Sequence, residues 1–222
     1  MIENVFAGTV KERWSGKPPS AIGKQPVPGR AQIAMLGLTV DQQADLEVHG
    51  GPDKALHHYP ADHYAAWRTE LGREDLLPGS YGENLSTNGL TEKTVCIGDV
   101  FRVGTAEVQV SQGRQPCWKL NAHVGETKLA HLFQKTGRTG WYYRVLLPGE
   151  VAAGGSLSLI ERLHPDWSVE RVTAARLTRE VRPEEAAILA RLSGMAERWR
   201  KAFEKMADGD ATEDTRSRLG HS

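Results

Sequence analysis

The sequence predicts a mainly β domain over residues 1–163, a three-helix domain over residues 166–208 and a disordered tail over residues 209–222. Up to about residue 163, apolar residues alternate mostly with a period of two, which is typical of strands that bury one face. From Ser168 onward, the apolar spacing becomes helical. With 222 residues, the chain can form one large domain and one small domain without covalent cross-links.

Six short runs rich in alternating apolar residues predict the strands. These runs are residues 5–10, 32–36, 100–103, 107–110, 141–145 and 157–160. Gly104 and Thr105 predict a tight hairpin between two of them, and Pro148 followed by Gly149 is the order favoured in a type II turn. Together these signals predict a β-barrel-like fold or a sandwich.

Two helices are expected to interrupt the strands. The first opens at Pro60, whose missing N–H is tolerated there, and ends before Gly72. The second spans residues 127–135 and ends before Gly137. Their inward faces are predicted to be Tyr64, Trp67 and Leu71 in the first, and Leu129, Leu132 and Phe133 in the second.

The C-terminal region carries three further helical patterns. They are marked by Val169, Val172 and Leu177, then by Pro183, Ala187, Ile188 and Leu192, and after Gly194 by Met195, Trp199, Phe203 and Met206. A unit of this size buries little surface alone, so we expect it to lean on the first domain. The polar composition of residues 209–222 predicts disorder.

Composition excludes several classes of protein. The chain has 28 basic and 28 acidic residues, so no global charge draws it to nucleic acid or to an anionic membrane. No apolar run approaches the roughly 20 residues that cross a bilayer, and the N-terminus lacks the pattern of a signal peptide. Two cysteines do not make a disulfide framework, so we expect a cytoplasmic protein in a reducing compartment.

Cys117 is the main candidate for chemistry. Arg114 and Lys119 flank it, and nearby positive charge favours the thiolate, the form that attacks carbon or binds a metal. The alternative is a buried cysteine that acts as a small hydrophobic residue. Cys96, in an apolar run without basic neighbours, is interpreted as a core residue of that kind.

Residues 49–54 concentrate His49, Gly50, Gly51 and Lys54 in one short segment. Paired glycines let backbone N–H groups approach a ligand, and such groups can form a concavity that binds anions. A tight turn with an incidental histidine explains the same residues.

Two other loops carry donors that could grip a ligand. Lys17, Ser20 and Lys24 supply the ammonium and hydroxyl groups that a phosphate ester prefers, although any solvated loop carries lysines. The Asn84 amide could hold a ligand heteroatom or cap its own turn.

Other cysteine and nucleotide chemistries fail on spacing. The zinc deaminase pattern needs a second cysteine three residues after Cys117, where Leu120 stands, and no histidine begins His-x-Glu. Two distant cysteines cannot hold a structural zinc or an iron–sulfur cluster. The chain also lacks the glycine-rich fingerprints of dinucleotide and P-loop sites.

Four motifs, at residues 49–56, 82–85, 97–100 and 115–117, occur in the order and spacing of the MOSC domain family. The C-terminal helices resemble the extension of its YiiM-type subgroup, so the resemblance covers the chain to about residue 207.

This resemblance implies a β-rich fold that holds the molybdenum cofactor (molybdopterin), with Cys117 as the protein ligand of the metal. A thiolate is a soft ligand, suited to a metal that already carries the sulfurs of the pterin. The residues assigned to the rest of the cofactor are Lys17, Ser20, Lys24, His49, Gly50, Gly51, Lys54, Asn84, Arg114 and Lys119. Lys54 stands where relatives often have arginine, which keeps the charge but loses a planar two-pronged donor.

The function that the resemblance implies is reduction of N-hydroxylated base analogues, such as 6-hydroxylaminopurine, to the amine. A separate flavoprotein would supply the electrons, since the chain has no electron-entry site of its own. Trp118 and Trp141 are candidates for stacking on a purine, or else core residues. The alternatives are a non-redox carrier of the cofactor or of sulfur on Cys117, and an interaction protein that binds a partner through its helices.

Overall fold

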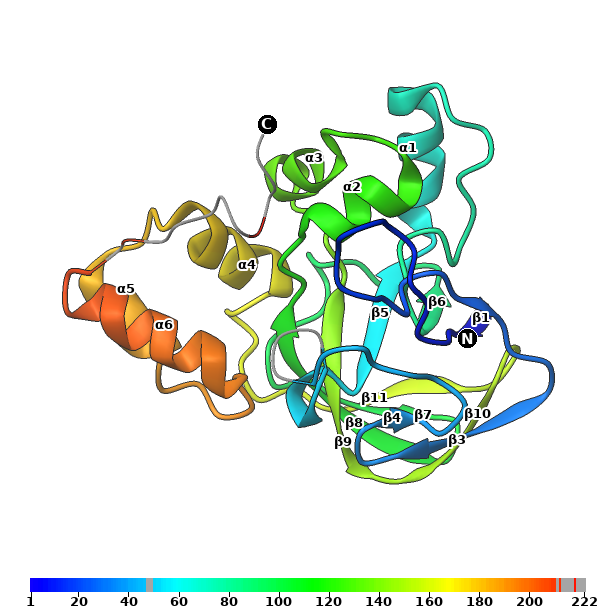
Figure 1. The fold of residues 1–222 in the computed structure, drawn as a ribbon. Helices are drawn as coiled ribbons and strands as arrows, with labels where there is room; N and C mark the ends of the chain where they lie inside the picture. The colour runs from blue at the N-terminus through cyan, green and yellow to red at the C-terminus, as the bar shows by residue number, and fades with distance from the viewer. Residues whose placement is uncertain (47–49, 211, 213–217, 219–222) are drawn as a thin grey trace.

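The computed structural model describes residues 1–46, 50–210, 212 and 218, and Figure 1 shows its arrangement. The strands are β1 (Asn4–Ala7), β2 (Gln25–Pro26), β3 (Arg30–Ala34), β4 (Gly37–Leu38), β5 (Leu56–Pro60), β6 (Leu85–Thr87), β7 (Val100–Val103), β8 (Ala106–Gly113), β9 (Trp141–Leu147), β10 (Gly149–Ala152) and β11 (Leu157–Glu161). The helices are α1 (Asp62–Leu71), α2 (Trp118–Val124), α3 (Leu129–Thr136), α4 (Val169–Thr178), α5 (Pro183–Leu189) and α6 (Glu197–Ala207), with a 3₁₀ turn η1 (Pro52–Lys54).

The described strands form a mixed sheet that stays open. Eight strands follow the order β11-β7-β8-β9-β5-β6-β1-β2, and a second sheet has the order β10-β3-β4. Only β5 and β6 pair in parallel; the other pairs are antiparallel. The fold therefore combines open sheets and six helices, and β2 and β11 are free edges of the larger sheet instead of closing a barrel.

All six predicted strand segments overlap strands, and the predicted hairpin joins β7 to β8. The first two were predicted too long, since β1 ends at Ala7 and β3 ends at Ala34. Gly104 has φ 60° there, and a Cβ at that position would lie 2.0 Å from the Glu150 carbonyl oxygen, so the turn requires glycine. The prediction of a type II turn at Gly149 is wrong. Gly149 does not have positive φ; it starts β10, opposite Ile33, so the chain passes almost directly from one sheet to the other.

The two inserted helices are close to their predictions. The first begins at Asp62, because Pro60 belongs to β5, and both helices end at a glycine in the left-handed region. They share an aromatic core, in which the Trp67 and Phe133 rings are stacked with centroids 5.0 Å apart. The sequence did not predict α2, which begins directly after Cys117.

Helices α4, α5 and α6 occur where three helices were predicted and lie together on one side of the sheets (Figure 1). The predicted inward face of α5 is wrong, because Ile188 is exposed and the buried residues are Ala186 and Leu189. The buried residues Val172, Leu189 and Phe203 of the three helices belong to the same hydrophobic cluster as Val110 and Tyr143 of the sheet. Helix α4 lies so close to the end of β8 that a Cβ on Gly113 would meet the Thr173 hydroxyl at 1.9 Å. The core is therefore continuous from the sheet into the helices. The boundary between the two predicted domains stays a prediction.

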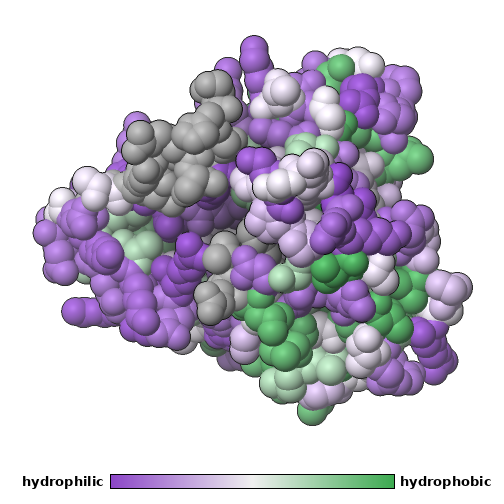
Figure 2. Space-filling view, viewed as in Figure 1, coloured by the Kyte–Doolittle hydropathy of each residue, from purple (hydrophilic) through white to green (hydrophobic). Residues whose placement is uncertain are grey.

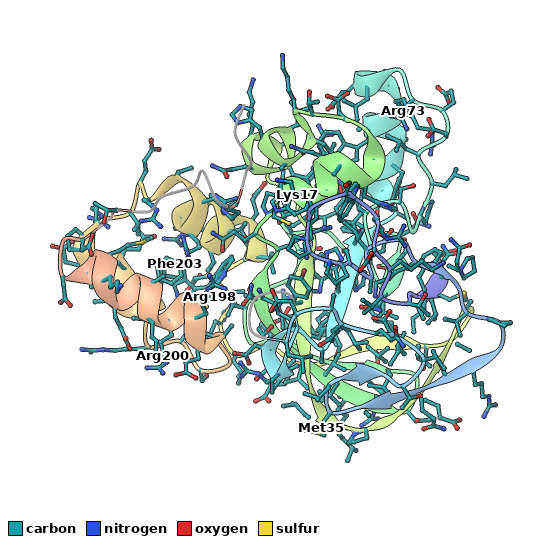
Figure 3. All side chains as sticks on the ribbon, in the orientation of Figure 1. Lys17, Met35, Arg73, Arg198, Arg200 and Phe203 are labelled. Atoms are coloured by element: carbon teal, nitrogen blue, oxygen red, sulfur yellow. The ribbon has the colours of Figure 1, made fainter. Side chains whose placement is uncertain are left out.

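The surface view in Figure 2 shows mostly polar side chains over the C-terminal helices, with apolar side chains gathered lower on the same face. Met35 and Leu36, in the turn between β3 and β4, are both about half exposed, and Met35 is labelled in Figure 3. None of the described helices is long and apolar enough to cross a membrane. Most of the tail predicted to be disordered, and His49, lie outside the described residues.

Candidate functional site

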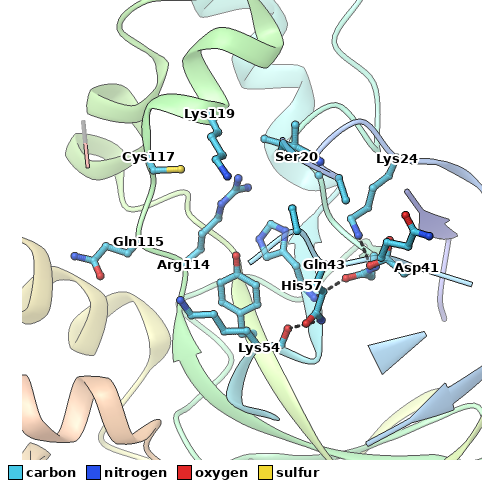
Figure 4. Close-up of a pocket in the computed structure, with 17 residues that line it drawn as sticks. Ser20, Lys24, Asp41, Gln43, Lys54, His57, Arg114, Gln115, Cys117 and Lys119 are labelled. Atoms are coloured by element: carbon cyan, nitrogen blue, oxygen red, sulfur yellow. Dashed lines mark hydrogen bonds and ion pairs between the residues drawn. The ribbon is translucent and has the colours of Figure 1, made fainter. Parts of the chain in front are cut away.

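A cavity opens beside Cys117, between the segment that follows β8, strand β5 and the loops before β2 and after β4 (Figure 4). Seven of the residues predicted from sequence lie on its wall: Ser20, Lys24, Lys54, Asn84, Arg114, Cys117 and Lys119. The fold thus brings together side chains that are up to 99 positions apart in the sequence.

Cys117 lies at the point where the chain turns from an extended segment into α2. Its side chain is partly exposed and faces the cavity (Figure 4). The preceding residue, Pro116, accepts a hydrogen bond from the Arg218 guanidinium at 2.8 Å. Cys96 differs in every respect: it is buried, its thiol faces the Pro165 carbonyl oxygen at 3.6 Å, and burial raises its pKa. Its interpretation as a core residue is confirmed.

Arg114 and Lys119 are almost fully buried on the same wall as Cys117. The Arg114 guanidinium donates to the Tyr81 carbonyl oxygen at 2.7 Å, and the Lys119 ammonium donates to the Pro19 carbonyl oxygen at 3.4 Å. Backbone carbonyls accept these hydrogen bonds without cancelling the positive charges. We call Lys54, Arg114, Cys117 and Lys119 the cationic wall.

Lys54 faces both the cavity and the C-terminal helices. Its ammonium lies 5.6 Å from the centroid of the Tyr142 ring. Burial, followed by repulsion from Arg198, lowers the pKa of Lys54 to about 8, although Cys117, Asp45 and Asp53 oppose the shift. The charge of this lysine therefore changes within a range of pH that a binding experiment can reach.

The opposite wall is held by hydrogen bonds inside the protein. The Asn84 side chain accepts from the His57 backbone N–H at 3.0 Å and donates to the Phe6 carbonyl oxygen at 3.2 Å and to Asp41 at 2.8 Å. Asp41 also accepts from the Gly8 backbone N–H at 2.6 Å and forms an ion pair with Lys24. We call Lys24, Asp41, His57 and Asn84 the anchored wall.

This arrangement gives Asn84 and Lys24 a structural task that the sequence did not reveal. The Asn84 amide joins the loop around Asp41 to the start of β6, so its donors and acceptor are engaged by the protein. Burial is the largest influence on Lys24 and lowers its pKa, while Asp41 raises it. Asp41 itself was not predicted, because its partners are distant in the sequence.

His57 is a second residue that sequence reasoning missed. It is buried on the cavity wall, and its Nε2 atom has no hydrogen-bond partner among the described residues. Burial, and next Arg114, keeps its pKa well below the usual value, so the imidazole is neutral. The sequence signal was the pair His57-His58, but all five residues of β5 are buried, so no alternation identified the strand.

Three other predicted residues lie away from the cavity. Lys17 is exposed, with its ammonium 5.6 Å from the Trp118 ring centroid. Gly50 and Gly51 line an adjacent hollow, which also borders Lys54. Of the two tryptophans, Trp141 is fully buried against His58, which confirms its core interpretation, whereas Trp118 is partly exposed and packs edge-on against Trp14.

Comparison with known proteins agrees with the motifs. A family model described as MOSC domain matches residues 45–158. The chain is 40% identical over 218 residues to Protein YiiM of Escherichia coli (strain K12), which covers 97% of this chain and 96% of that protein. It is also 40% identical over 179 residues to a protein named Reductase from Gibberella moniliformis (strain M3125 / FGSC 7600), covering 78% of this chain and 32% of that protein.

The same fold occurs in a solved structure. The crystal structure of YiiM from Escherichia coli matches with a TM-score of 0.81 and 35% sequence identity, and the match covers 98% of each chain.

Proposed function

The chain belongs to the MOSC domain family, and we propose that it is a molybdenum-cofactor-dependent oxidoreductase that reduces N-hydroxylated compounds. The observation that carries this proposal is the cavity that Cys117 lines together with the cations Lys54, Arg114 and Lys119. The relative named Reductase supports the reaction class. The proposed substrates are N-hydroxylated base analogues such as 6-hydroxylaminopurine.

The side chains around the cavity fit an anionic cofactor that brings sulfur ligands of its own. A thiolate is a soft metal ligand, and three cations beside it suit the negative charge of a phosphate. Among the described residues, no three His, Cys, Asp or Glu side chains come together as a metal site. Cys117 would be the protein ligand of a metal that the cofactor itself carries, and the bound cofactor would supply two-electron redox chemistry that side chains lack.

The protein's own residues would bind the cofactor, orient it and shield it. Arg114 and Lys119 donate hydrogen bonds to backbone carbonyls and form no ion pair with a carboxylate in the described part of the chain, so their positive charges can attract the cofactor. The anchored wall fixes the opposite side of the cavity, and the neutral His57 adds no further charge to it. Tyr142 also lines the cavity, and its ring lies 4.9 Å from that of His57.

The proposed reaction consumes two electrons and two protons for each substrate. The N–O bond of the hydroxylamino group breaks, the oxygen leaves as water, and the amine remains. The electrons come from a separate flavoprotein, because the sequence carries no flavin or nicotinamide motif.

The test uses protein purified from a host that makes the molybdenum cofactor. With a reduced artificial electron donor, wild type should convert 6-hydroxylaminopurine to adenine. Cys117→Ala should slow this conversion at least about 100-fold, because loss of a metal ligand costs more than loss of a residue behind it. Cys96→Ala is the matched control, since this cysteine lies in the core away from the cavity.

Equal turnover by Cys117→Ala and wild type would remove Cys117 from the mechanism. A persulfide on Cys117, found by mass spectrometry in protein without molybdenum and without turnover, would instead support the carrier function.

A further inference from the structure

Gln43 lies on the wall of the cavity and has no role in the chemistry proposed above. It belongs to the loop that follows β4, two residues after Asp41 of the anchored wall. Its side chain is partly exposed, and Figure 4 marks its hydrogen bond to Lys54 with a dashed line. The Gln43 amide is therefore a place where the loop after β4 contacts the cationic wall.

This amide holds both ends of the η1 turn. Its carbonyl oxygen accepts a hydrogen bond from the Gly51 backbone N–H at 3.1 Å, and its amino group donates to the Lys54 carbonyl oxygen at 3.4 Å. The turn between these ends is closed by the Lys54 backbone N–H, which donates to the Gly51 carbonyl oxygen at 3.0 Å. The Gln43 amino group also donates to the Leu36 carbonyl oxygen, in the turn between β3 and β4, at 3.0 Å. Donor and acceptor of this amide are thus both bonded to backbone.

The glycine pair before the turn makes room for the Gln43 side chain. A Cβ on Gly50 would lie 2.3 Å from Oε1 of Gln43 and 3.0 Å from its Cδ. Gly51 has φ 84°, a left-handed conformation that favours glycine, and a Cβ there would lie 2.9 Å from the Leu46 carbonyl oxygen. Because the Gly51 N–H donates to Gln43, this N–H serves the turn itself and not an anion.

Other contacts hold the centre of the turn against the sheet. The Asp53 carbonyl oxygen accepts from the Ser111 hydroxyl at 2.6 Å, and the Asp53 carboxylate accepts from Arg144 at 2.6 Å and 3.0 Å. These bonds do not involve Gln43, so the turn should stay on the sheet when Gln43 is changed. Lys54 and Gln43 line the cavity and Asp53 does not, so Gln43 holds the side of the turn that carries the Lys54 ammonium.

We propose that Gln43 is a positioning residue: by holding the backbone of Gly51 and Lys54, it places the Lys54 ammonium where this cation meets a phosphate group in the cavity. This inference rests on the proposed function, in which Lys54 helps to bind the cofactor. A lysine ammonium sits on a flexible four-carbon stem, so the space that it can reach depends on how firmly its backbone is held. Loss of the Gln43 amide would spread the ammonium over more positions and weaken its contact with an anion.

The experiment measures the affinity of the full chain, purified without the cofactor, for inorganic phosphate at pH 7 by titration calorimetry. Gln43→Ala should lower this affinity at least about fivefold, because a charge-assisted hydrogen bond is weakened. In the Lys54→Met background, the same change should alter the affinity less than about twofold, because no ammonium is left to position. A general loosening of the cavity would instead lower the affinity by the same factor in both backgrounds.

Gly50→Ala tests the inference with the Gln43 side chain in place. The added Cβ would displace the Gln43 amide, so the loss of phosphate affinity should match that of Gln43→Ala. The two changes together should cost no more than either alone, because the Cβ then meets no amide. Hydrogen exchange at the Gly51 backbone N–H, followed by NMR, should be faster in Gln43→Ala, since this N–H loses its acceptor.

Gln42→Ala is the matched control. Gln42 also borders the cavity, but its carbonyl oxygen accepts from the Val10 backbone N–H at 2.8 Å, and it makes no hydrogen bond to the turn among the described residues. This variant should keep the phosphate affinity within about twofold of wild type and leave the exchange rate of the Gly51 N–H unchanged.

Three results would overturn the inference. They are equal phosphate affinity of Gln43→Ala and wild type, an equal loss of affinity in the wild-type and Lys54→Met backgrounds, and no phosphate binding by wild type, since Lys54 would then meet no anion. Molybdenum analysis keeps the proposed function separate. Molybdenum in wild type from a host that makes the cofactor, with unchanged phosphate affinity in Gln43→Ala, would reject only this inference. No molybdenum in wild type, with the expected phosphate results, would reject only the proposed function.

Discussion

The two walls of the cavity differ in how their polar groups are satisfied. On the anchored wall, the Asn84 amide donates a hydrogen bond to Asp41, both side chains also bond to backbone groups of distant segments, and Lys24 is paired with the Asp41 carboxylate. On the cationic wall, Arg114 and Lys119 bond to backbone carbonyls and keep their charge. We propose that the anchored wall maintains the shape of the cavity and that the cationic wall carries its chemistry. Substitutions on the two walls should therefore affect different measurements.

The largest effect on stability is expected from Asp41→Ala, on the anchored wall. This change leaves the Lys24 ammonium buried without its carboxylate and removes acceptors from Asn84 and Gly8. Breaking a buried ion pair by removing one partner costs about 3–5 kcal/mol. Urea denaturation should show this loss in the free energy of unfolding.

The double change Lys24→Met with Asp41→Asn serves as the control, because it removes both charges and keeps an amide for hydrogen bonding. It should recover most of the lost stability. If Asp41→Ala unfolds at the same urea concentration as wild type, the anchored wall does not have the structural role described here.

A smaller effect, on binding instead of stability, is expected from the titration of Lys54. Its pKa is lowered to about 8, so its positive charge is present below that pH and is lost as the pH rises above it. A bound anion favours the charged form. The affinity for inorganic phosphate should therefore fall several-fold between about pH 7 and pH 9. Fluorescence or calorimetric titrations at several pH values would measure this change.

Lys54→Arg sharpens the test, because a guanidinium does not titrate in this range. The variant should keep its affinity for phosphate at pH 9, and Lys54→Met should bind phosphate weakly at every pH. An equally steep loss of affinity in Lys54→Arg would assign the pH dependence to another group.

The smallest effect is expected from Lys17→Ala. Lys17 lies outside the cavity, exposed and over the Trp118 ring, on neither wall. An exposed cation contact of this kind contributes about 0.5–1 kcal/mol at most. Molybdenum content and catalytic rate should both stay within about twofold of wild type. A larger loss of molybdenum would return Lys17 to the cofactor site.

The sequence predicted the elements that have a local signal. Alternation identified β7 and the start of β8, and the closing glycines at positions 72 and 137 marked the ends of α1 and α3. Strand β5 was missed because it is buried on both faces, so its residues do not alternate. Helix α2 was missed because seven residues are too few to show a period.

The cavity was predictable only in part, for a similar reason. The motif around Cys117 and its flanking cations could be recognised locally, and the structure places them on one wall. Asp41 and Arg198 could not be recognised from the sequence, because their roles come from contacts with segments far away in the chain. Asn84 was recognised, but its partners Phe6 and Asp41 show that its amide supports the wall from within.

The central claim is that the cationic wall holds a molybdenum cofactor through Cys117. Molybdenum analysis of wild type and Cys117→Ala, both purified from a host that makes the cofactor, tests it most directly. The claim predicts nearly stoichiometric molybdenum in wild type and a large loss in the variant, while the circular dichroism spectra stay the same. Equal molybdenum in the two proteins, or none in wild type, would contradict it.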